Sequence, residues 1–212
     1  MLIELHKLKY FFLTHNNIKR KNHILNVFKE VDLTEVNPTN YESRNKSGAS
    51  GFLKMLELGE KNQDPNKVFK PFILLEDDIE KYREFPESLE IPNNTDILYI
   101  GLTRCGIMID NWSFNVYYSN INNNIIKVEN MLALHGLIIC SQTGLNIFKT
   151  SLIKDFELDQ PWDISIAKAQ PFYNIFALRK PLVFQKAELG GQEELTKIEY
   201  EDYEHCNPNK ST

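Results

Sequence analysis

Three consecutive acids, Glu76, Asp77 and Asp78, are the residues whose type and spacing point most directly to chemistry. They follow an apolar run at residues 72–75, which predicts a strand buried on both faces. Carboxylates at the end of a buried strand repel one another and resist losing water. A divalent cation would offset both effects, so the sequence predicts a metal site at this acidic triplet.

Side chains alternate along a strand, which places Glu76 and Asp78 on one side and Asp77 on the other. Two carboxylates make a sparse oxygen site. Mn²⁺ or Mg²⁺ suits such a site, because substrate phosphates and water can complete the coordination shell. We therefore expect Glu76 and Asp78 to hold the metal. The alternative interpretation is an acidic strand end that is solvated at the surface.

The elements that must position these acids alternate between strands and helices. Apolar runs at residues 9–13, 31–36, 97–100 and 136–139 predict further strands, and Ser141 is expected to cap a helix after the last of them. Strands and helices alternate through the first half of the chain. This pattern predicts an α/β sandwich around a mostly parallel sheet.

The first predicted helix, over residues 18–30, carries cations in an unusual place. Asn16 or Asn17 is expected to cap it, and Arg20 lies in its first turn with lysines on either side. Cations there oppose the helix dipole. A phosphate nearby would explain them, and simple solvation would explain them equally well.

Two more helix starts are predicted from capping residues. Ser47 or Ser50 is expected to cap the second helix. Later in the chain, Asp159 as cap and Pro161 near the first position predict another helix. Asp163 would then lie in the first turn, where it either stabilises the helix dipole or faces a ligand.

Arg104 follows the predicted strand at residues 97–100. In open α/β sheets, ligands bind outside the carboxyl ends of the strands. Arg104 is therefore a candidate for contact with a phosphate or an acceptor, although a plain surface arginine is the other interpretation.

Composition limits the classes of function. A chain of 212 residues fits one domain, and a net charge of −5 disfavours a broad electrostatic grip on nucleic acid. The sequence has no apolar stretch of the length that a membrane span needs and no signal-peptide pattern. Its three scattered cysteines suggest a reducing compartment, so we expect a cytoplasmic protein. The glycine motifs of ordinary dinucleotide-binding and P-loop proteins are absent.

Several strings resemble one family. The segments ILLEDDI at residues 73–79 and DILYIG at 96–101 resemble the lipopolysaccharide-type glycosyltransferases of family 25, which have the GT-A fold. The strings PWD at 161–163 and YNIFAL at 173–178 are similar to the closing portion of that family. The chain also resembles the small GT-A domain of a chlorella-virus glycosyltransferase that decorates capsid glycans. The resemblance covers residues 9–185, and only the acidic motif in it is specific.

This resemblance implies a Rossmann-like fold of the nucleotide-diphospho-sugar transferases, with a mixed sheet flanked by helices. It implies a single domain over residues 1–212, with a nucleotide-binding part at about 1–105 and an acceptor-side part at about 106–212. The expected function is metal-dependent transfer of a sugar from a UDP-sugar donor to a hydroxyl of a glycan acceptor. A viral protein of this kind would act in the host cytoplasm.

The resemblance also implies roles for individual residues. The nucleotide sugar would be bound by Thr14, His15, Asn16, Arg20, Ser50, Asp77 and Arg104. An inverting reaction needs a carboxylate base, for which Asp163 is the first candidate and Asp159 the second. A retaining reaction needs no such base, and the sequence does not choose between the two. Trp162 is either a surface on which a sugar stacks or a core aromatic residue.

Two other functions remain open at this point. One is a catalytically silent domain of the same fold that binds a glycan or a protein partner. The other is a nucleotidyltransferase that makes nucleotide sugars. The second is disfavoured because such enzymes begin with a glycine-rich loop, whereas Thr14, His15 and Asn16 contain no glycine.

Overall fold

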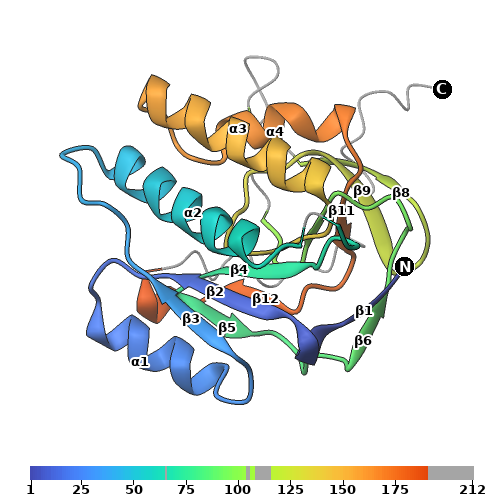
Figure 1. Cartoon of the computed structure of the whole chain (residues 1–212), viewed down its shortest axis with the longest axis horizontal. Coiled ribbons are helices and arrows are strands. Elements are labelled where there is room, and N and C mark those ends of the chain that lie inside the picture. Colours follow the sequence, from blue (N-terminus) through green and yellow to red (C-terminus); the bar gives the residue numbers. More distant parts are fainter. Residues whose placement is uncertain (65, 104–105, 108–115, 191–212) are drawn as a thin grey trace.

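A computed structural model describes residues 1–64, 66–103, 106–107 and 116–190. Arg104, one of the predicted binding residues, therefore lies outside the described residues. The centre of the molecule is an eight-stranded mixed sheet in the order β3-β2-β4-β10-β7-β11-β9-β8 (Figure 1). Its strands are β2 (Lys9–Leu13), β3 (Leu33–Val36), β4 (Phe72–Glu76), β7 (Ile97–Tyr99), β8 (Tyr117–Asn120), β9 (Ile125–Asn130), β10 (Gly136–Ile139) and β11 (Ile175–Leu178).

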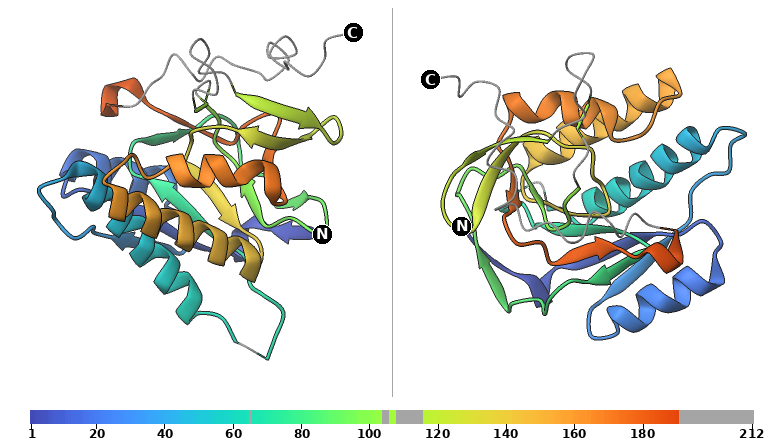
Figure 2. Two further views of the ribbon diagram at one scale, coloured as in Figure 1. Left: turned by 90° about the horizontal axis from the view of Figure 1, so that it is seen from above. Right: turned by 180° about the vertical axis from the view of Figure 1, so that it is seen from behind.

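Helices cover both faces of this sheet. Figure 1 shows α2, α3 and α4 above the sheet and α1 below it, and the two views in Figure 2 agree. The helices are α1 (Ile18–Val27), α2 (Arg44–Lys61), α3 (Gln142–Leu158) and α4 (Ile164–Ala169). In the part of the chain that the structure describes, none of the helices is long and apolar enough to cross a bilayer.

Two small sheets and three short 3₁₀ helices complete the described fold. One small sheet pairs β1 with β6 and the other pairs β5 with β12, both antiparallel. Their bounds are β1 (Leu2–Glu4), β6 (Ser88–Glu90), β5 (Ile79–Lys81) and β12 (Val183–Gln185), and the 3₁₀ helices are η1 (Leu5–Lys7), η2 (Gln170–Phe172) and η3 (Ala187–Leu189).

The two faces of the central sheet bury two separate apolar cores. Phe11 and Leu74 point into the core beneath α2 and α3, whereas Phe12 and Leu75 point into the core that contains Ile24 of α1. All five side chains are at most 2% exposed. Because both faces are covered, the central strands read as unbroken apolar runs, as the sequence predicted.

The prediction of a mostly parallel sheet is only partly confirmed. β2 runs parallel to β3 and β4, and β7 runs parallel to β11. However, β10 runs antiparallel to both of its neighbours, and so does β9. By these pairings, β9 and β10 run in one direction and the other six strands of the central sheet run in the opposite direction.

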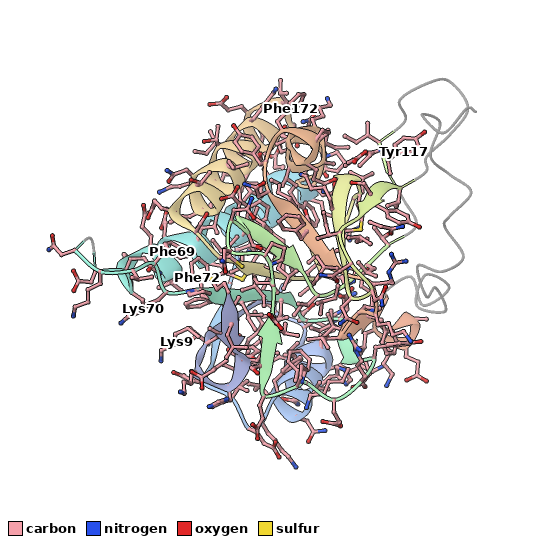
Figure 3. The ribbon with its side chains drawn as sticks, turned by 90° about the vertical axis from the view of Figure 1, so that its right-hand side faces the viewer. Lys9, Phe69, Lys70, Phe72, Tyr117 and Phe172 are labelled. Carbon is pink, nitrogen blue, oxygen red and sulfur yellow. The ribbon has the colours of Figure 1, made fainter. Side chains whose placement is uncertain are left out.

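This arrangement gives the sheet two opposite edges, by which we mean the sides formed by the strand ends and not the outermost strands β3 and β8. At one edge, Glu76 at the carboxyl end of β4 pairs with Leu13 of β2, and Gly136 at the start of β10 pairs with Leu75. At the other edge, Lys9 pairs with Phe72 at the amino ends of β2 and β4, and Figure 3 labels both residues. The acidic triplet thus lies where two carboxyl ends and one antiparallel amino end meet.

The predicted strands at residues 9–13, 72–75, 97–100 and 136–139 are confirmed to within one residue at their ends. Asn17 caps α1, because its side chain accepts a hydrogen bond from the backbone N–H of Arg20. Ser141 caps α3, as predicted.

Two predicted helix starts are wrong. Ser43 caps α2, so Ser47 and Ser50 lie inside the helix and offer no free backbone N–H groups there. Asp159 does not start a helix but ends α3, with a left-handed backbone at φ 50°. The helix that follows begins at Ile164, directly after Asp163.

Candidate functional site

A cleft of about 830 Å³ opens at the edge of the sheet that carries the acidic triplet. Segments from both halves of the chain line it, which is the usual position of a ligand site in an open α/β sheet. The lining residues are Leu13, His15, Asn17, Arg20, Arg44, Asn45, Glu76, Asp77, Asp78, Thr103, Leu132, Ala133, Leu134, His135, Pro161, Trp162, Asp163, Ile164, Gln185 and Gly190.

The acidic triplet forms one wall of this cleft. Asp77 and Asp78 are only 2% and 6% exposed. Arg20 Nη1 lies 3.2 Å from Asp77 Oδ1 and 3.6 Å from Asp78 Oδ2, so one guanidinium faces both carboxylates. The other oxygens, Asp77 Oδ2 and Asp78 Oδ1, are buried and have no hydrogen-bond partner among the described residues. Such unpartnered buried oxygens are rare in folded proteins, and a cation, a water molecule or a ligand donor would satisfy them.

Gln185 joins the two acids that the sequence assigned to a metal. β12 pairs with β5, which places Gln185 opposite Ile79, directly after the triplet. The Gln185 side-chain amide donates to Glu76 Oε2 at 3.1 Å and to Asp78 Oδ2 at 3.5 Å. Nothing in the sequence pattern pointed to Gln185, because it lies more than a hundred residues beyond the acids that it orients.

Burial and mutual repulsion shift the pKa values of these carboxyls upward. The pKa of Glu76 is raised well above 4.5, first by burial and then by the nearby charges of Asp78, Asp163 and Asp77. Burial also raises the pKa of Asp78, while the Arg20 guanidinium works against this shift. Strongly shifted carboxyls in a cleft are a common mark of functional sites.

A divalent metal ion fits this wall chemically. Within the described ranges, no group of three His, Cys, Asp or Glu side chains is arranged to hold a metal ion. A metal here would therefore rely on Glu76 and Asp78, with oxygens of a bound phosphate and water completing its shell. The unpartnered oxygen of Asp78 and the raised pKa of both carboxyls are the observations that favour a cation.

The segment that joins α3 to the first two residues of α4, residues 160–165 (the 160–165 loop), forms the opposite wall and is held firmly. Asp155 of α3 is fully buried, and both of its carboxylate oxygens accept from the backbone N–H of Ser165, each at 3.1 Å. The Gln160 side chain also donates to Asp155, and its backbone N–H donates to the Asp155 carbonyl. The 160–165 loop is thus fixed before any ligand binds, and it presents Trp162 and Asp163 to the cleft.

Asp163 has a carboxyl group suited to taking up a proton near neutral pH. Burial raises its pKa from 3.8 to about 6, and the charge of Asp155 adds to this shift. At pH 7 the group is therefore mostly ionised but sits close to its pKa, which is the range in which a general base works best. Asp163 also lies near enough to Glu76 for its charge to raise the pKa of that residue.

The structure brings together some of the predicted site residues and separates others. Glu76, Asp77, Asp78, Asp163, His15 and Arg20 all line the cleft.

Three other predicted binding residues and the second base candidate lie outside the cleft lining. Thr14 is fully buried with an unpartnered hydroxyl, and Asn16 is exposed with a left-handed backbone at φ 57°. Ser50 is buried inside α2 and bonds to the backbone of Thr39. Asp159 is exposed and accepts a hydrogen bond from Ser43.

Arg44 and His135 are further cleft residues that sequence reasoning missed. Arg44 could have been found only if the helix start at Ser43 had been recognised. His135 is buried, its Nε2 has no partner among the described residues, and burial lowers its pKa to about 4. It is therefore neutral at pH 7, and no signal in the sequence distinguished it from the other histidines.

No protein-family model matches this chain, and no curated protein matches it either. The function is therefore argued from the cleft, its two walls and their charges.

Proposed function

We propose that the protein is a metal-dependent glycosyltransferase that moves a sugar from a UDP-sugar donor to a hydroxyl of a glycan acceptor. The single observation that carries the proposal is the acidic wall of the cleft, where two carboxylates have buried, unpartnered oxygens. That wall lies at the carboxyl ends of two parallel strands, where phosphate-bearing ligands bind in related architectures. The sequence resemblance of the strings around Glu76 supplies the reaction class.

Glu76 and Asp78 would hold Mn²⁺ or Mg²⁺, with Gln185 fixing the orientation of both carboxylates. The metal would neutralise charge on the leaving diphosphate. Arg20 faces Asp77 and Asp78 and would supply a second positive charge beside the donor.

His15 and Arg44 extend the donor side of the cleft beyond the acids. Burial chiefly lowers the pKa of His15; the charge of Asp77 opposes this shift, and the charges of Arg44 and Arg20 add to it. Arg44 opens an 18-residue helix, α2, so its position combines a guanidinium with a helix amino end. These groups suit the phosphates and polar edges of a nucleotide.

Asp163 is the group best placed to accept the proton of the acceptor hydroxyl. In an inverting reaction, the acceptor oxygen attacks the anomeric carbon and the bond to the diphosphate breaks. The electron pair leaves with UDP, and the acceptor proton passes to Asp163. In a retaining reaction, the leaving phosphate itself would take that proton and Asp163 would only bind the acceptor.

One observation favours a second candidate, a silent glycan-binding domain. Arg20 already offsets part of the charge of Asp77 and Asp78, so the acidic wall has an internal cation. A domain of this kind would bind a glycan in the cleft without any need for metal or nucleotide.

Calorimetric titration with UDP, in the presence and absence of Mn²⁺, tests the proposal, with GDP and ADP as nucleotide controls. We expect UDP binding that requires Mn²⁺ and that weakens by at least about 100-fold in Asp78→Asn. Asp64→Asn is the matched control, because Asp64 is outside the cleft lining and pairs with Lys67.

The outcome separates the two candidates. If UDP does not bind with or without metal, the glycosyltransferase proposal fails and the silent domain becomes the better account. If UDP binds equally well without Mn²⁺ and in Asp78→Asn, a nucleotide site exists but the role assigned to the acids is wrong.

A further inference from the structure

Trp162 occupies an unusual position on the wall opposite the acids. Its side chain is half-buried and lines the cleft, while part of it packs against the core beneath α2. A tryptophan whose only role was core packing would gain nothing from lining a polar cleft beside a carboxylate. Its surroundings show how the ring is held.

One side of the Trp162 ring rests directly on the backbone of α2 at Gly48. A Cβ atom added at Gly48 would lie 2.4 to 2.8 Å from three ring carbons, a distance that real Cβ atoms do not adopt. Glycine is a poor helix former, so its presence inside an 18-residue helix needs a reason. The reason here is that only glycine leaves room for the indole.

Two further contacts fix the ring before any ligand binds. The Trp162 side chain lies close enough to Glu76 to lower the pKa of that carboxyl. The 160–165 loop is held at both ends by the buried carboxylate of Asp155. A rigid ring loses little conformational freedom on binding, which favours its use as a recognition surface.

We propose that Trp162 is a stacking surface for an uncharged pyranose ring of the acceptor, which presents a hydroxyl to Asp163. This inference rests on the proposed function and names the class of acceptor. The C–H groups on one face of a pyranose carry partial positive charge and pack on the negative face of an aromatic ring. Pro161 and Ile164 line the same cleft and add apolar surface to it.

The charges nearby restrict the acceptor further. Asp163 follows Trp162 in the chain, and Glu76 lies close to the Trp162 side chain in the same cleft, so two carboxyls border the stacking surface. An acidic sugar placed there would meet like charges. Neutral hexoses and deoxyhexoses are therefore the expected occupants, in preference to uronic or sialic acids.

Fluorescence makes the stacking directly observable. The sequence contains two tryptophans, so Trp112→Phe leaves Trp162 as the only indole. We would titrate that variant with methyl glycosides of glucose, galactose, mannose and fucose, and with methyl glucuronide as the acidic control. At least one neutral glycoside is expected to shift Trp162 emission in a saturable way, with little response to the glucuronide.

Variants of the chain with Trp112 intact, followed by saturation-transfer NMR, separate stacking from packing. Trp162→Ala is expected to weaken binding of the same glycoside by about tenfold or more, and Trp162→Phe by less. Gly48→Ala should also weaken it several-fold, because the new Cβ pushes the indole into the cleft. Gly59→Ala is the matched control: it lies in the same helix but meets Phe72 at the far edge of the sheet.

These measurements of glycoside binding do not depend on the nucleotide site. The inference is overturned if no neutral glycoside binds, or if Trp162→Ala and Gly48→Ala bind it as well as Gly59→Ala does. If UDP binds with Mn²⁺ but glycoside binding does not depend on Trp162, the proposed stacking role of Trp162 is wrong and the enzyme proposal stands. If glycosides need Trp162 but UDP never binds, the stacking surface stands and the protein is a glycan-binding domain.

Discussion

The two walls of the cleft differ in how completely their polar groups are satisfied. In the acidic wall, Asp77 Oδ2 and Asp78 Oδ1 are buried without a partner among the described residues. In the wall formed by the 160–165 loop, Asp155 is at least as deeply buried but accepts several hydrogen bonds from Gln160 and Ser165. Among the described residues, the acidic wall thus has buried carboxylate oxygens without partners, whereas the buried carboxylate that holds the 160–165 loop is satisfied by hydrogen bonds; we call the second wall finished in this sense.

This difference indicates two kinds of ligand. A buried carboxylate without a donor is destabilising unless a cation or a donor completes it. We infer that a cation belongs to the acidic wall. The finished wall needs no ion, and its rigidity suits a neutral ligand that is recognised by shape.

The largest expected effect concerns Asp163, the carboxylate that the 160–165 loop presents to the cleft. Asp163→Asn should lower the rate of sugar transfer by about 10²- to 10⁴-fold, because a general base is lost, while leaving UDP binding close to normal. In the wild type, the rate should fall as the pH drops below about 6, as Asp163 takes up a proton. Initial rates with a UDP-sugar and an accepted glycan, measured across pH, provide the check.

Asp159→Asn is the natural comparison for that variant. Asp159 is exposed and lies outside the cleft lining, so we expect an almost unchanged rate. A loss in Asp159→Asn with full activity in Asp163→Asn would transfer the role of base to Asp159. Full activity in both variants would indicate a retaining reaction.

The next effect tests whether the loop wall depends on its internal hydrogen bonds. Asp155→Ala leaves the buried N–H of Ser165 without its acceptor, which should lower the free energy of unfolding by about 1–3 kcal/mol. Asp155→Asn keeps one acceptor and should lose less. Chemical denaturation measures both, with Glu157→Ala as an exposed control on the same helix.

Equal stability of the Asp155→Ala and Glu157→Ala variants would contradict the view that the loop wall is finished. The same variants can be scored for glycoside binding. Loss of binding without loss of stability would show that Asp155 matters mainly for the position of Trp162.

A smaller effect tests whether the acidic wall binds a cation. Arg20 is the internal cation beside Asp77 and Asp78, so it should compete with an added metal. Gly190, with φ 92°, lies against the Arg20 guanidinium and restricts the rotamers that the Arg20 side chain can adopt. Arg20→Ala is therefore expected to bind Mn²⁺ about tenfold more tightly in the absence of nucleotide.

Titration of free Mn²⁺ by electron paramagnetic resonance gives this affinity. Lys21→Ala is the control, because Lys21 pairs with Glu35 and does not line the cleft. Weaker Mn²⁺ binding in Arg20→Ala than in the control would show that the guanidinium supports the metal site instead of competing with it.

The smallest expected effect is on the pH dependence of the free energy of unfolding. Because burial raises the pKa of Asp163 from 3.8 to about 6, the folded chain binds more protons there than the unfolded chain does between these values. The free energy of unfolding therefore falls as the pH rises through this range. Asp163→Asn removes that loss, so its Tm should exceed that of the wild type by about 2–4 °C at about pH 7.5 and match it at about pH 4. A Tm difference that does not vary with pH would contradict a raised pKa.

Sequence alone was enough for features that depend on neighbouring residues. The buried strand β4 and the acids at its end could be predicted because an unbroken apolar run followed by charge is a local pattern. The caps Asn17 and Ser141 were equally local. The start of α2 was missed because the Ser43 cap precedes a run of small and polar residues that does not look helical.

The side chains that surround the acids could not be predicted, because distant segments supply them. Gln185 reaches the acids only through the pairing of β12 with β5, and that pairing leaves no trace in local composition. The antiparallel insertion of β10, which brings His135 to the same edge, was hidden for the same reason.

The amino-acid sequence by itself determined that a buried strand would end in three carboxylates, because burial and charge are properties of adjacent residues. Only the tertiary structure decided which of those oxygens would find partners. Arg20 and Gln185 reach some of them, and no described residue reaches Asp77 Oδ2 or Asp78 Oδ1. The physical reason is that satisfying a buried charge depends on groups brought close by folding, at distances that sequence spacing does not encode.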